Sequence, residues 1–372
     1  MKRRAFLGGA AAATTAAAAA TAASSFPAPA IAQGKVEWRM VTTWPKNYPG
    51  QGTGAERFAR SIADATDGRL TIKVYGAGEL VPPFESFDAV QQGSADLMHA
   101  TPYYWQGKSK AMNFFSTVPY GMTTTELQAW VRFGGGQELW DELYDGFGLK
   151  PFYGGSTGVQ MGGWFNREIN SLADFQGLKM RIPGLGGEML RRLGVTVVNL
   201  PAGEIMPALQ SGSIDATEWV GPFNDLTFGF YKSAKYYYWP GVHEPGTEVE
   251  ITVSKQKFMD LPQDLRAIFE LATRAEDIML TAEFNARNGQ ALRTLIDEHG
   301  VELRRFPDEV LAGLGEAAGE VLAEMRDSGD DLTKRIVESF LQRRAELMGW
   351  TDIGEHAYTQ ARNLGFPFPT AS

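Results

Sequence analysis

One arginine in a short alternating pattern is the side chain of this sequence most suited to binding a ligand. Arg181 lies in the run 178–183, which predicts a strand with Arg181 and Lys179 on one face and Met180 and Ile182 on the other. A planar guanidinium matches a carboxylate through two parallel, charge-assisted hydrogen bonds. Arg181 therefore indicates a site for a small organic acid, although a surface arginine on a half-buried strand is the commoner origin of this pattern.

Three other side chains offer oxygen atoms near the ends of predicted strands. Glu218, followed by Trp219, comes just after a segment that leads into a strand, and Gln160 lies in a strand that we expect to connect two lobes. Glu244 lies in a loop rich in Pro and Gly. Hard cations such as Na⁺ or Ca²⁺ prefer carboxylate and amide oxygens. If the three side chains converge they form a cation site, whereas each one alone is typical of a solvated acid or amide.

The sequence carries few signs of catalysis. It contains no His-Glu-x-x-His and no P-loop, and its four histidines are scattered along the chain. Of these, His99 and His243 could approach the cleft, but a structural role is the commoner one for such histidines. The absence of cysteine excludes thiolate chemistry, iron–sulfur clusters and thiolate zinc sites. Glu218 and Glu244 are the one candidate acid–base pair. A metal-dependent lyase or isomerase acting on keto or hydroxy acids therefore stays an alternative to a binding protein.

A repeated phrase indicates how the chain is organised. Segments 89–96 and 208–215 share Ala, Gln, Gly, Ser and Asp at matching places. Each copy is typical of a helix that ends at a glycine, Gly93 or Gly212, before a short approach to a strand. Two such units far apart predict two similar α/β lobes, and ligands favour the clefts between lobes.

The remaining pattern supports an α/β fold of two lobes joined by crossover strands. A strand over 36–42, a helix over 54–66 and a strand over 70–75 open the first lobe as a βαβ unit. Tyr103 and Tyr104 follow a strand expected near 96–100, where open sheets place ligands, so both are expected to line the cleft.

The second half of the chain completes the two lobes. We expect crossover strands at 159–166 and 248–254, followed by helices over 265–299, 308–325 and 332–348. The predicted units are lobe I over 33–157 and 218–250, lobe II over 158–217 and 251–305, and C-terminal helices over 306–372 with a possible role in dimerisation.

The N-terminus predicts export. Lys2, Arg3 and Arg4 precede an apolar Ala- and Thr-rich stretch, and 30–32 reads Ala-Ile-Ala. This is typical of a twin-arginine-like signal over 1–32, cleaved after Ala32, and places the protein in the periplasm. A formal net charge of −9 argues against binding of nucleic acid.

Three of these motifs together resemble a known family. The segment Ser-Leu-Ala-Asp-Phe-Gln-Gly-Leu-Lys-Met-Arg-Ile-Pro at 171–183, the repeat at 208–215 and the pair Glu218-Trp219 are similar to the extracytoplasmic solute receptors of TRAP transporters, the tripartite ATP-independent periplasmic systems. Tyr-Tyr-Tyr-Trp-Pro-Gly at 236–241 and Glu-Pro-Gly at 244–246 further resemble the branch that binds 2-oxo acids or lactate-like hydroxy acids with a metal ion.

The resemblance implies a two-lobed periplasmic binding fold, type II-like, that closes on its ligand and delivers it to membrane permease subunits. A receptor domain that feeds a membrane sensor is an alternative. The resemblance also implies a homodimer formed by exchange of a C-terminal helix, with a helix packed on its own lobe as the alternative. The site residues implied by the resemblance are Arg181 for the substrate carboxylate, Gln160, Glu218 and the Trp219 carbonyl for the cation, Glu244 beside either, and Tyr103 and Tyr104 lining the pocket.

Overall fold

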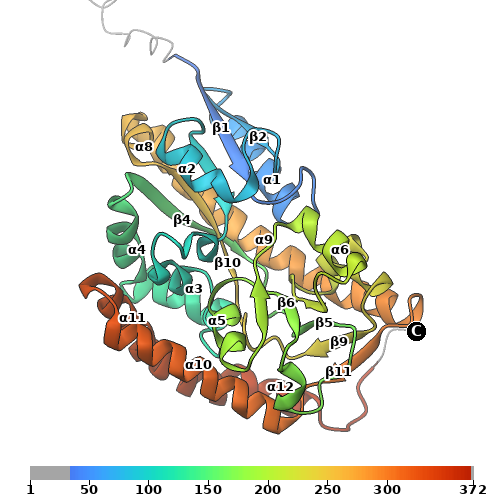
Figure 1. The fold of residues 1–372 in the computed structure, drawn as a ribbon. Coiled ribbons are helices and arrows are strands. Elements are labelled where there is room, and N and C mark those ends of the chain that lie inside the picture. The colour runs from blue at the N-terminus through green and yellow to red at the C-terminus, as the bar shows by residue number, and fades with distance from the viewer. Residues whose placement is uncertain (1–33, 370–372) are drawn as a thin grey trace, which may run out of the picture.

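Two β-sheets form the centres of two lobes in the computed structural model, which describes residues 34–369 (Figure 1). The sheet of lobe I has the strand order β2-β1-β3-β10-β4, and the sheet of lobe II has the order β11-β9-β5-β8-β6-β7. Lobe I contains β1 (Val36–Thr42), β2 (Leu70–Tyr75), β3 (Leu97–Ala100), β4 (Leu149–Ser156) and β10 (Glu248–Ser254). Lobe II contains β5 (Gly163–Phe165), β6 (Lys179–Arg181), β7 (Thr196–Val198), β8 (Ala216–Thr217), β9 (Tyr236–Trp239) and β11 (Glu302–Arg305).

Both sheets combine parallel neighbours with an antiparallel strand. In lobe I, β1 pairs in parallel with β2 and β3, and β10 runs antiparallel to β3 and β4. In lobe II, β6 pairs in parallel with β7 and β8, and β5 runs antiparallel to β8 and β9. The parallel pairs require helical crossovers, which the sequence predicted as βαβ units. The predicted two-lobed α/β fold is confirmed.

The two copies of the repeated phrase occupy equivalent places in the two lobes. Helix α2 (Ser86–Gln91) precedes β3, and α6 (Ala202–Ser211) precedes β8. Gly93 and Gly212 have φ angles of 79° and 70°, the left-handed conformation in which glycine has no steric cost. Each helix therefore ends as the sequence predicted.

The aspartate that closes each copy ties the helix end to the neighbouring strand. The Asp96 carboxylate accepts a hydrogen bond from the backbone N–H of Arg39 at 2.5 Å, and the Asp215 carboxylate accepts one from the N–H of Lys179 at 2.9 Å. Their own N–H groups donate to the carbonyls of the same two residues. The aspartate of each repeat therefore has a structural role, because it attaches the helix end to a strand of the sheet, β1 in lobe I and β6 in lobe II.

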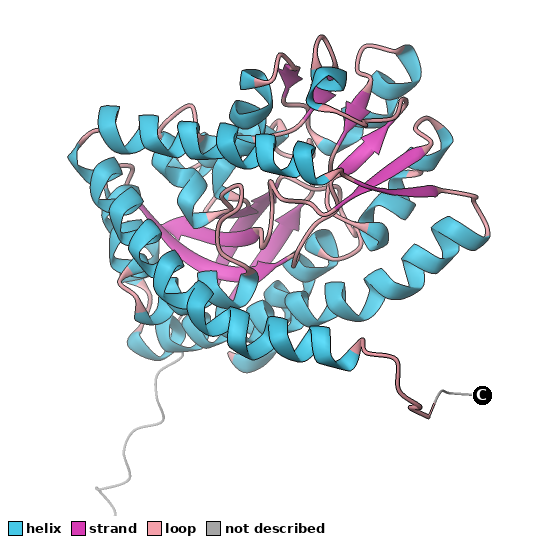
Figure 2. Cartoon of the chain, turned by 90° about the horizontal axis from the view of Figure 1, so that it is seen from below, coloured by secondary structure: helices cyan, strands magenta, loops and turns pink. Residues whose placement is uncertain are grey.

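Helices surround both sheets (Figure 2). The 35-residue helix α9 (Gln263–Asp297) contacts α1 and β4 of lobe I as well as α7, so it links the two halves of the molecule. No helix among the described residues has the length and apolar character needed to cross a membrane. The other long or site-bearing helices are α1 (Gln51–Ala65), α3 (Thr124–Phe133), α4 (Gly136–Asp145), α5 (Gly184–Arg192), α7 (Pro222–Phe228), α8 (Lys255–Asp260), α10 (Asp308–Ser328), α11 (Asp331–Thr351) and α12 (Ala357–Arg362).

The C-terminal helices pack on both lobes and do not form a separate unit. The first half of α10 contributes Val310 and Leu314 to the core of lobe II, while its second half contributes Met325 to the core of lobe I. Ile336 and Phe340 of α11 are fully buried in that same lobe I core. The first half of α11 therefore packs against the lobe I core.

The sheets correct the predicted lobe boundaries. Residues 218–250 were expected in lobe I, but β9 pairs with β5 and β11 of lobe II. Residues 251–305 were expected in lobe II, but β10 continues to Ser254 and pairs with lobe I strands. An alternating pattern reveals a strand but not its partner, because pairing is set by long-range register.

The first crossover is also shorter than expected. Only Gly163–Phe165 of the predicted strand 159–166 is a strand, and the residues before it form a loop. The predicted export signal and its cleavage site after Ala32 lie outside the described residues.

Candidate functional site

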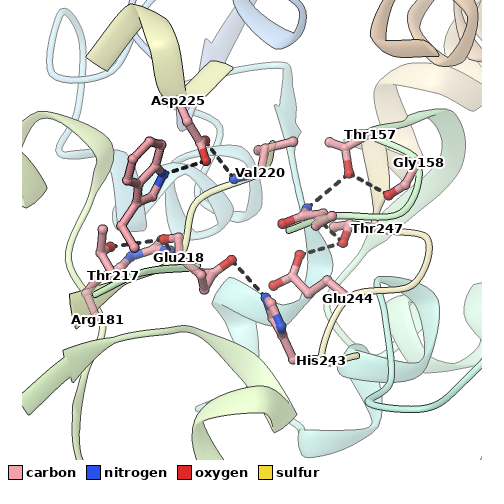
Figure 3. A network of polar contacts seen from close by, with 12 residues as sticks. Thr157, Gly158, Arg181, Thr217, Glu218, Val220, Asp225, His243, Glu244 and Thr247 are labelled. Carbon is pink, nitrogen blue, oxygen red and sulfur yellow. Dashed lines mark hydrogen bonds and ion pairs between the residues drawn. The ribbon is translucent and has the colours of Figure 1, made fainter. Parts of the chain in front are cut away.

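The register of lobe II brings Arg181 beside Glu218. Arg181 of β6 pairs with Thr217 of β8, so Glu218 follows directly at the end of the strand, and its N–H donates to the Arg181 carbonyl at 3.2 Å. The two side chains form an ion pair of 2.5 Å between Nη1 and Oε1 (Figure 3). Each side chain is 1% exposed, so the pair lies in a water-poor environment where electrostatic interactions are strong.

The rest of the Arg181 guanidinium is only partly used. Its Nε donates to the Leu200 carbonyl at 3.1 Å, and Nη1 also donates to the Glu218 carbonyl at 3.0 Å. Its centre lies 5.1 Å from the centroid of the Trp219 ring. Among the described residues, the buried Nη2 has no hydrogen-bond partner. A buried, unpartnered cationic donor is costly, so Nη2 is suited to a ligand that supplies an anionic oxygen.

The two crossover connections run side by side at the base of the cleft. The N–H of Gln160, in the first connection, donates to the Glu244 carbonyl at 3.1 Å, and the N–H of Gly241, in the second, donates to the Gln160 carbonyl at 3.1 Å. A Cβ at position 241 would lie 2.3 Å from the Gln160 carbonyl oxygen. Glycine at 241 is therefore required for this close approach.

Two threonines fix the Gln160 amide. Its Nε2 donates to Thr157 Oγ1 at 3.0 Å and to Thr247 Oγ1 at 3.1 Å. Its buried Oε1 has no partner among the described residues. Both N–H groups of the amide are thus occupied, and the oxygen is free to accept a ligand.

Two acids and a histidine meet beside this amide. Glu218, His243 and Glu244 each offer a ligand atom, and these atoms all lie within 4.8 Å of one another. His243 Nε2 lies 3.2 Å from Glu218 Oε2, and Thr247 Oγ1 donates to Glu244 Oε2 at 2.5 Å. Figure 3 shows the Glu218 side chain directed toward the His243 ring. All three side chains are buried.

Burial dominates the electrostatics of this cluster. Burial raises the pKa of the Glu218 carboxyl to about 7, and the adjacent Arg181 guanidinium opposes that rise. Burial, reinforced by repulsion from Glu218, raises the pKa of Glu244 to about 8. Burial lowers the pKa of His243, which favours its neutral form. Two carboxyl groups against one guanidinium leave the cluster short of positive charge.

The donor set fits a hard cation. Carboxylate and amide oxygens are preferred by Na⁺ and Ca²⁺, and the free Gln160 Oε1 adds an oxygen to those of Glu218 and Glu244. Among the described residues, no hydrogen bond reaches the Trp219 carbonyl. Its oxygen is therefore also available. A neutral His243 can hold the Glu218 carboxylate by donating from Nε2.

Aromatic side chains enclose the site. Tyr103 and Tyr104 lie on a 3₁₀ turn, Pro102–Trp105, that directly follows β3, as the sequence predicted. Both hydroxyls lie within the electrostatic reach of Arg181 and Glu218. A small pocket next to the Gln160 amide is lined by Trp44, Gln51, Thr101, Tyr103, Tyr104, Thr157, Trp219, Val220, Thr247 and Val249.

A sequence that resembles a hydrolase motif has a structural role. Residues 154–158 read Gly-Gly-Ser-Thr-Gly, but Ser156 is fully buried at the end of β4. Its hydroxyl lies 2.8 Å from Thr124 Oγ1 and accepts a hydrogen bond from the N–H of Gly158. Ser156 therefore has no base to activate it within the described residues.

The structure brings the predicted site residues together. Arg181, Glu218 and Trp219 come from lobe II, Tyr103 and Tyr104 come from lobe I, and Gln160 and Glu244 come from the connections between the lobes. Sequence reasoning treated His243 as structural and overlooked Thr157 and Thr247. The adjacency of His243 to Glu244 was the one available signal, because the threonines act through contacts that the sequence does not encode locally.

Comparison with known proteins agrees with this geometry. Residues 40–328 match the family described as bacterial extracellular solute-binding protein, family 7, or DctP. A monocarboxylate 2-oxoacid-binding periplasmic protein of Nostoc sp. is 40% identical over 323 residues, which cover 87% of this chain and 88% of that protein.

Two solved structures are also similar. A TRAP periplasmic solute-binding protein of Pseudoalteromonas atlantica, with bound sodium and pyruvate, has a TM-score of 0.85 and 40% identity, covering 88% of this chain and 99% of that chain. A TRAP transporter solute-binding protein of Bordetella bronchiseptica, a mixed-occupancy dimer with calcium and picolinate, has a TM-score of 0.87 and 35% identity, covering 89% and 98%. The predicted family and the prediction of a receptor in place of an enzyme are confirmed. The chain therefore belongs to family 7 of the bacterial extracellular solute-binding proteins, the DctP family, whose members are the periplasmic receptors of TRAP transporters.

Proposed function

We propose that this receptor captures a small 2-oxo monocarboxylate such as pyruvate together with Na⁺ or Ca²⁺ and delivers the acid to TRAP permease subunits. The relatives from Nostoc, Pseudoalteromonas and Bordetella support this ligand class and both cations. The main support from this chain is one pair of unpartnered buried atoms at the same site, the donor Arg181 Nη2 and the acceptor Gln160 Oε1. The Arg181 donor suits an anionic oxygen of the acid, and the Gln160 acceptor suits the cation.

Each site residue has a distinct task in this proposal. Arg181 binds and orients the substrate carboxylate, with its fork already held by Leu200 and Glu218. Gln160, Glu218, Glu244 and the Trp219 carbonyl hold the cation, and Tyr103 and Tyr104 exclude water and contact the ligand. When bound, the cation supplies positive charge that offsets repulsion between the buried carboxylates and an anionic ligand.

The lining of the pocket beside Gln160 favours a small monocarboxylate. Trp44, Trp219 and two tyrosines contribute aromatic rings to it, and the other lining residues are small or uncharged. It suits the short side chain of a monocarboxylate better than a second carboxylate, because no basic side chain lines it.

Capture is proposed to occur by closure of the lobes about the connections 157–162 and 240–247. The ligand stabilises the closed state because it contacts Arg181 in one lobe and Tyr103 in the other, and an acid bound by only one lobe would give no such preference. We assign residues to the rigid lobes by sheet membership, so 163–239 moves with lobe II and β10 with lobe I.

We further propose that export removes residues 1–32 after Ala32 and that the mature protein forms homodimers. A mixed-occupancy dimer in the Bordetella relative supports the second point. In this chain, Trp350, Ile353 and Tyr358 beyond the buried half of α11 are 64–72% exposed, which is unusual for large apolar side chains at one end of a soluble chain.

A thermal-shift screen tests the proposed function. Small monocarboxylates, dicarboxylates and amino acids are each added with Na⁺, with Ca²⁺ or with chelator in a cation-poor buffer. A ligand that binds the native state raises the midpoint by mass action. Stabilisation by 2-oxo monocarboxylates only when a cation is present supports the proposal, and stabilisation by none of them refutes it.

A further inference from the structure

A loop of lobe I is held rigidly at the edge of the cleft. The loop joins β1 to α1, and its Trp44 carbonyl accepts a hydrogen bond from Thr42 Oγ1 at 2.7 Å. The Trp44 indole N–H donates to His99 Nδ1 on β3 at 2.8 Å. The carbonyl of Tyr48 accepts from the N–H of Thr53 in α1 at 2.9 Å. The Tyr48 backbone is thus fixed to lobe I.

Helix α7 is held to the sheet of lobe II by one carboxylate, and it also contacts α9, the helix that links the two lobes. The Asp225 carboxylate accepts hydrogen bonds from the Trp164 indole at 2.9 Å, the Tyr237 hydroxyl at 2.7 Å and the Val220 N–H at 3.2 Å. Trp164 and Tyr237 belong to the neighbouring strands β5 and β9. Figure 3 shows Asp225 above the segment that carries Glu218 and Val220. Asp225 therefore fixes both α7 and the backbone that follows Glu218.

Tyr48 connects these two rigid elements across the lobes. Its hydroxyl donates to the Asn224 carbonyl at 2.9 Å, and the Asn224 side-chain Nδ2 donates back to the Pro49 carbonyl at 2.8 Å. The Tyr48 ring stacks on Phe228 with a centroid distance of 4.8 Å. Tyr48 and Asn224 are buried. Tyr48 is anchored in lobe I and Asn224 lies on a helix whose Asp225 is anchored in lobe II, so these contacts join the two lobes.

The same tyrosine reaches the proposed cation ligands. The edge-on contact between Tyr48 and Trp219 has a centroid distance of 6.3 Å, and Arg181 lies over the Trp219 ring. We propose that Tyr48 and Asn224 form an interlobe clasp, the pair of hydrogen bonds described above, which stabilises the closed receptor and positions the Trp219 segment for the cation and the acid. This inference rests on the proposed function. Tyr48 is a positioning residue and contacts neither ligand.

The clasp has a measurable signature. In the open receptor, water replaces the Tyr48–Asn224 hydrogen bond, so that bond contributes to the closed state alone. Its loss should weaken ligand binding without weakening the ligand-free fold. A single net hydrogen bond corresponds to about a fivefold change in Kd.

The test compares Tyr48→Phe with wild type. Tyr236→Phe, a change on β9 of a ring that makes cation–π contacts, is the matched control. Calorimetry gives the Kd for pyruvate with saturating Ca²⁺, thermal melting gives the stability of the ligand-free protein, and small-angle X-ray scattering gives the radius of gyration with and without pyruvate.

We expect Tyr48→Phe to raise the Kd for pyruvate about five- to tenfold and to leave the melting midpoint of the ligand-free protein unchanged. At subsaturating pyruvate, its radius of gyration should be larger than that of wild type. Tyr236→Phe should match wild type in all three. An unchanged Kd, or a Kd change matched by an equal loss of ligand-free stability, overturns the clasp. Failure of wild type to bind pyruvate or related acids counts against the proposed function itself, and so the two failures are distinguished by the wild-type titration.

Discussion

Arg181 and Glu218 form a buried ion pair in which each side chain can still bind a further group, the arginine through Nη2 and the glutamate as a cation ligand. One arm of the Arg181 fork binds Glu218 at 2.5 Å, and the other arm, Nη2, has no partner within the described residues. Glu218 meanwhile faces His243 and Glu244. A buried ion pair contributes little stability because desolvation offsets its attraction. The pair is better explained as a preorganised half-site for an anion and a cation.

Arg181→Lys tests the carboxylate contact. Lysine keeps the charge beside Glu218 but loses the planar fork, and loss of a charge-assisted hydrogen bond to the acid costs roughly 2 kcal/mol or more. We expect pyruvate affinity to fall by about 30-fold or more by calorimetry. Arg191→Lys, an exposed change, is the control. Wild-type affinity in Arg181→Lys would show that another residue binds the acid.

Gln160→Leu tests the amide as a cation ligand. The change removes Oε1 and the two hydrogen bonds to Thr157 and Thr247 but keeps a similar volume. We expect the Ca²⁺ concentration needed for half-maximal pyruvate binding to rise at least about tenfold, the scale of a lost polar contact to a charged group. Gln256→Leu on the surface should have no effect. An unchanged Ca²⁺ requirement would remove Gln160 from the cation site.

Stability should depend on pH through a buried acid outside the site. Burial raises the pKa of Glu250 to about 7, although Trp105 and Thr252 donate hydrogen bonds to it. The folded state therefore retains a proton that the unfolded chain releases near pH 4.5, so this contribution is complete at lower pH and is lost as pH rises to about 7. The free energy of unfolding should fall by up to about 3 kcal/mol across this range.

Urea denaturation at several pH values, using Glu250→Gln, checks this assignment. The variant should lose a large part of the decline between pH 5 and 7, because glutamine does not titrate. The exposed change Glu138→Gln should retain the wild-type decline. Equal slopes in wild type and Glu250→Gln would mean that Glu250 is ionised in the folded protein.

The exposed apolar residues at the end of α11 and just beyond it predict a dimer. Ile353 is 72% exposed, so Ile353→Glu removes apolar contact area without touching the core residues Ile336 and Phe340. Light scattering should give twice the chain mass for wild type and the single-chain mass for Ile353→Glu. Leu80→Glu, in a lobe I loop, should stay dimeric. A dimeric Ile353→Glu protein would place the interface elsewhere.

Local patterns in the sequence predicted the elements well. The strands over 36–42, 70–75 and 248–254 appear at those residues, and three long helices appear within a few residues of their expected ends. Arg181 was recognisable because one charged residue interrupted an apolar strand. Gly93 and Gly212 were recognisable because a helix end needs a residue that tolerates positive φ.

Long-range relationships were not predictable in the same way. The strand β9 was assigned to the wrong lobe because nothing in its aromatic sequence specifies β5 as its partner. The residues just before β5 do not form the predicted strand, because their backbone N–H groups donate to three different segments, at Glu244, Val220 and Tyr238. His243 and Tyr48 acquire their roles only through contacts with residues distant in sequence.

The most direct test of the central claim is the linkage between acid and cation. The Kd for pyruvate is measured by calorimetry at a series of Ca²⁺ concentrations, and the Kd for Ca²⁺ at a series of pyruvate concentrations, since coupling between two sites is reciprocal. Shared ligation by Arg181, Gln160 and Glu218 predicts that each ligand tightens the other by the same factor. Pyruvate binding that is equally tight in chelator, or no pyruvate binding at any Ca²⁺ concentration, would contradict it.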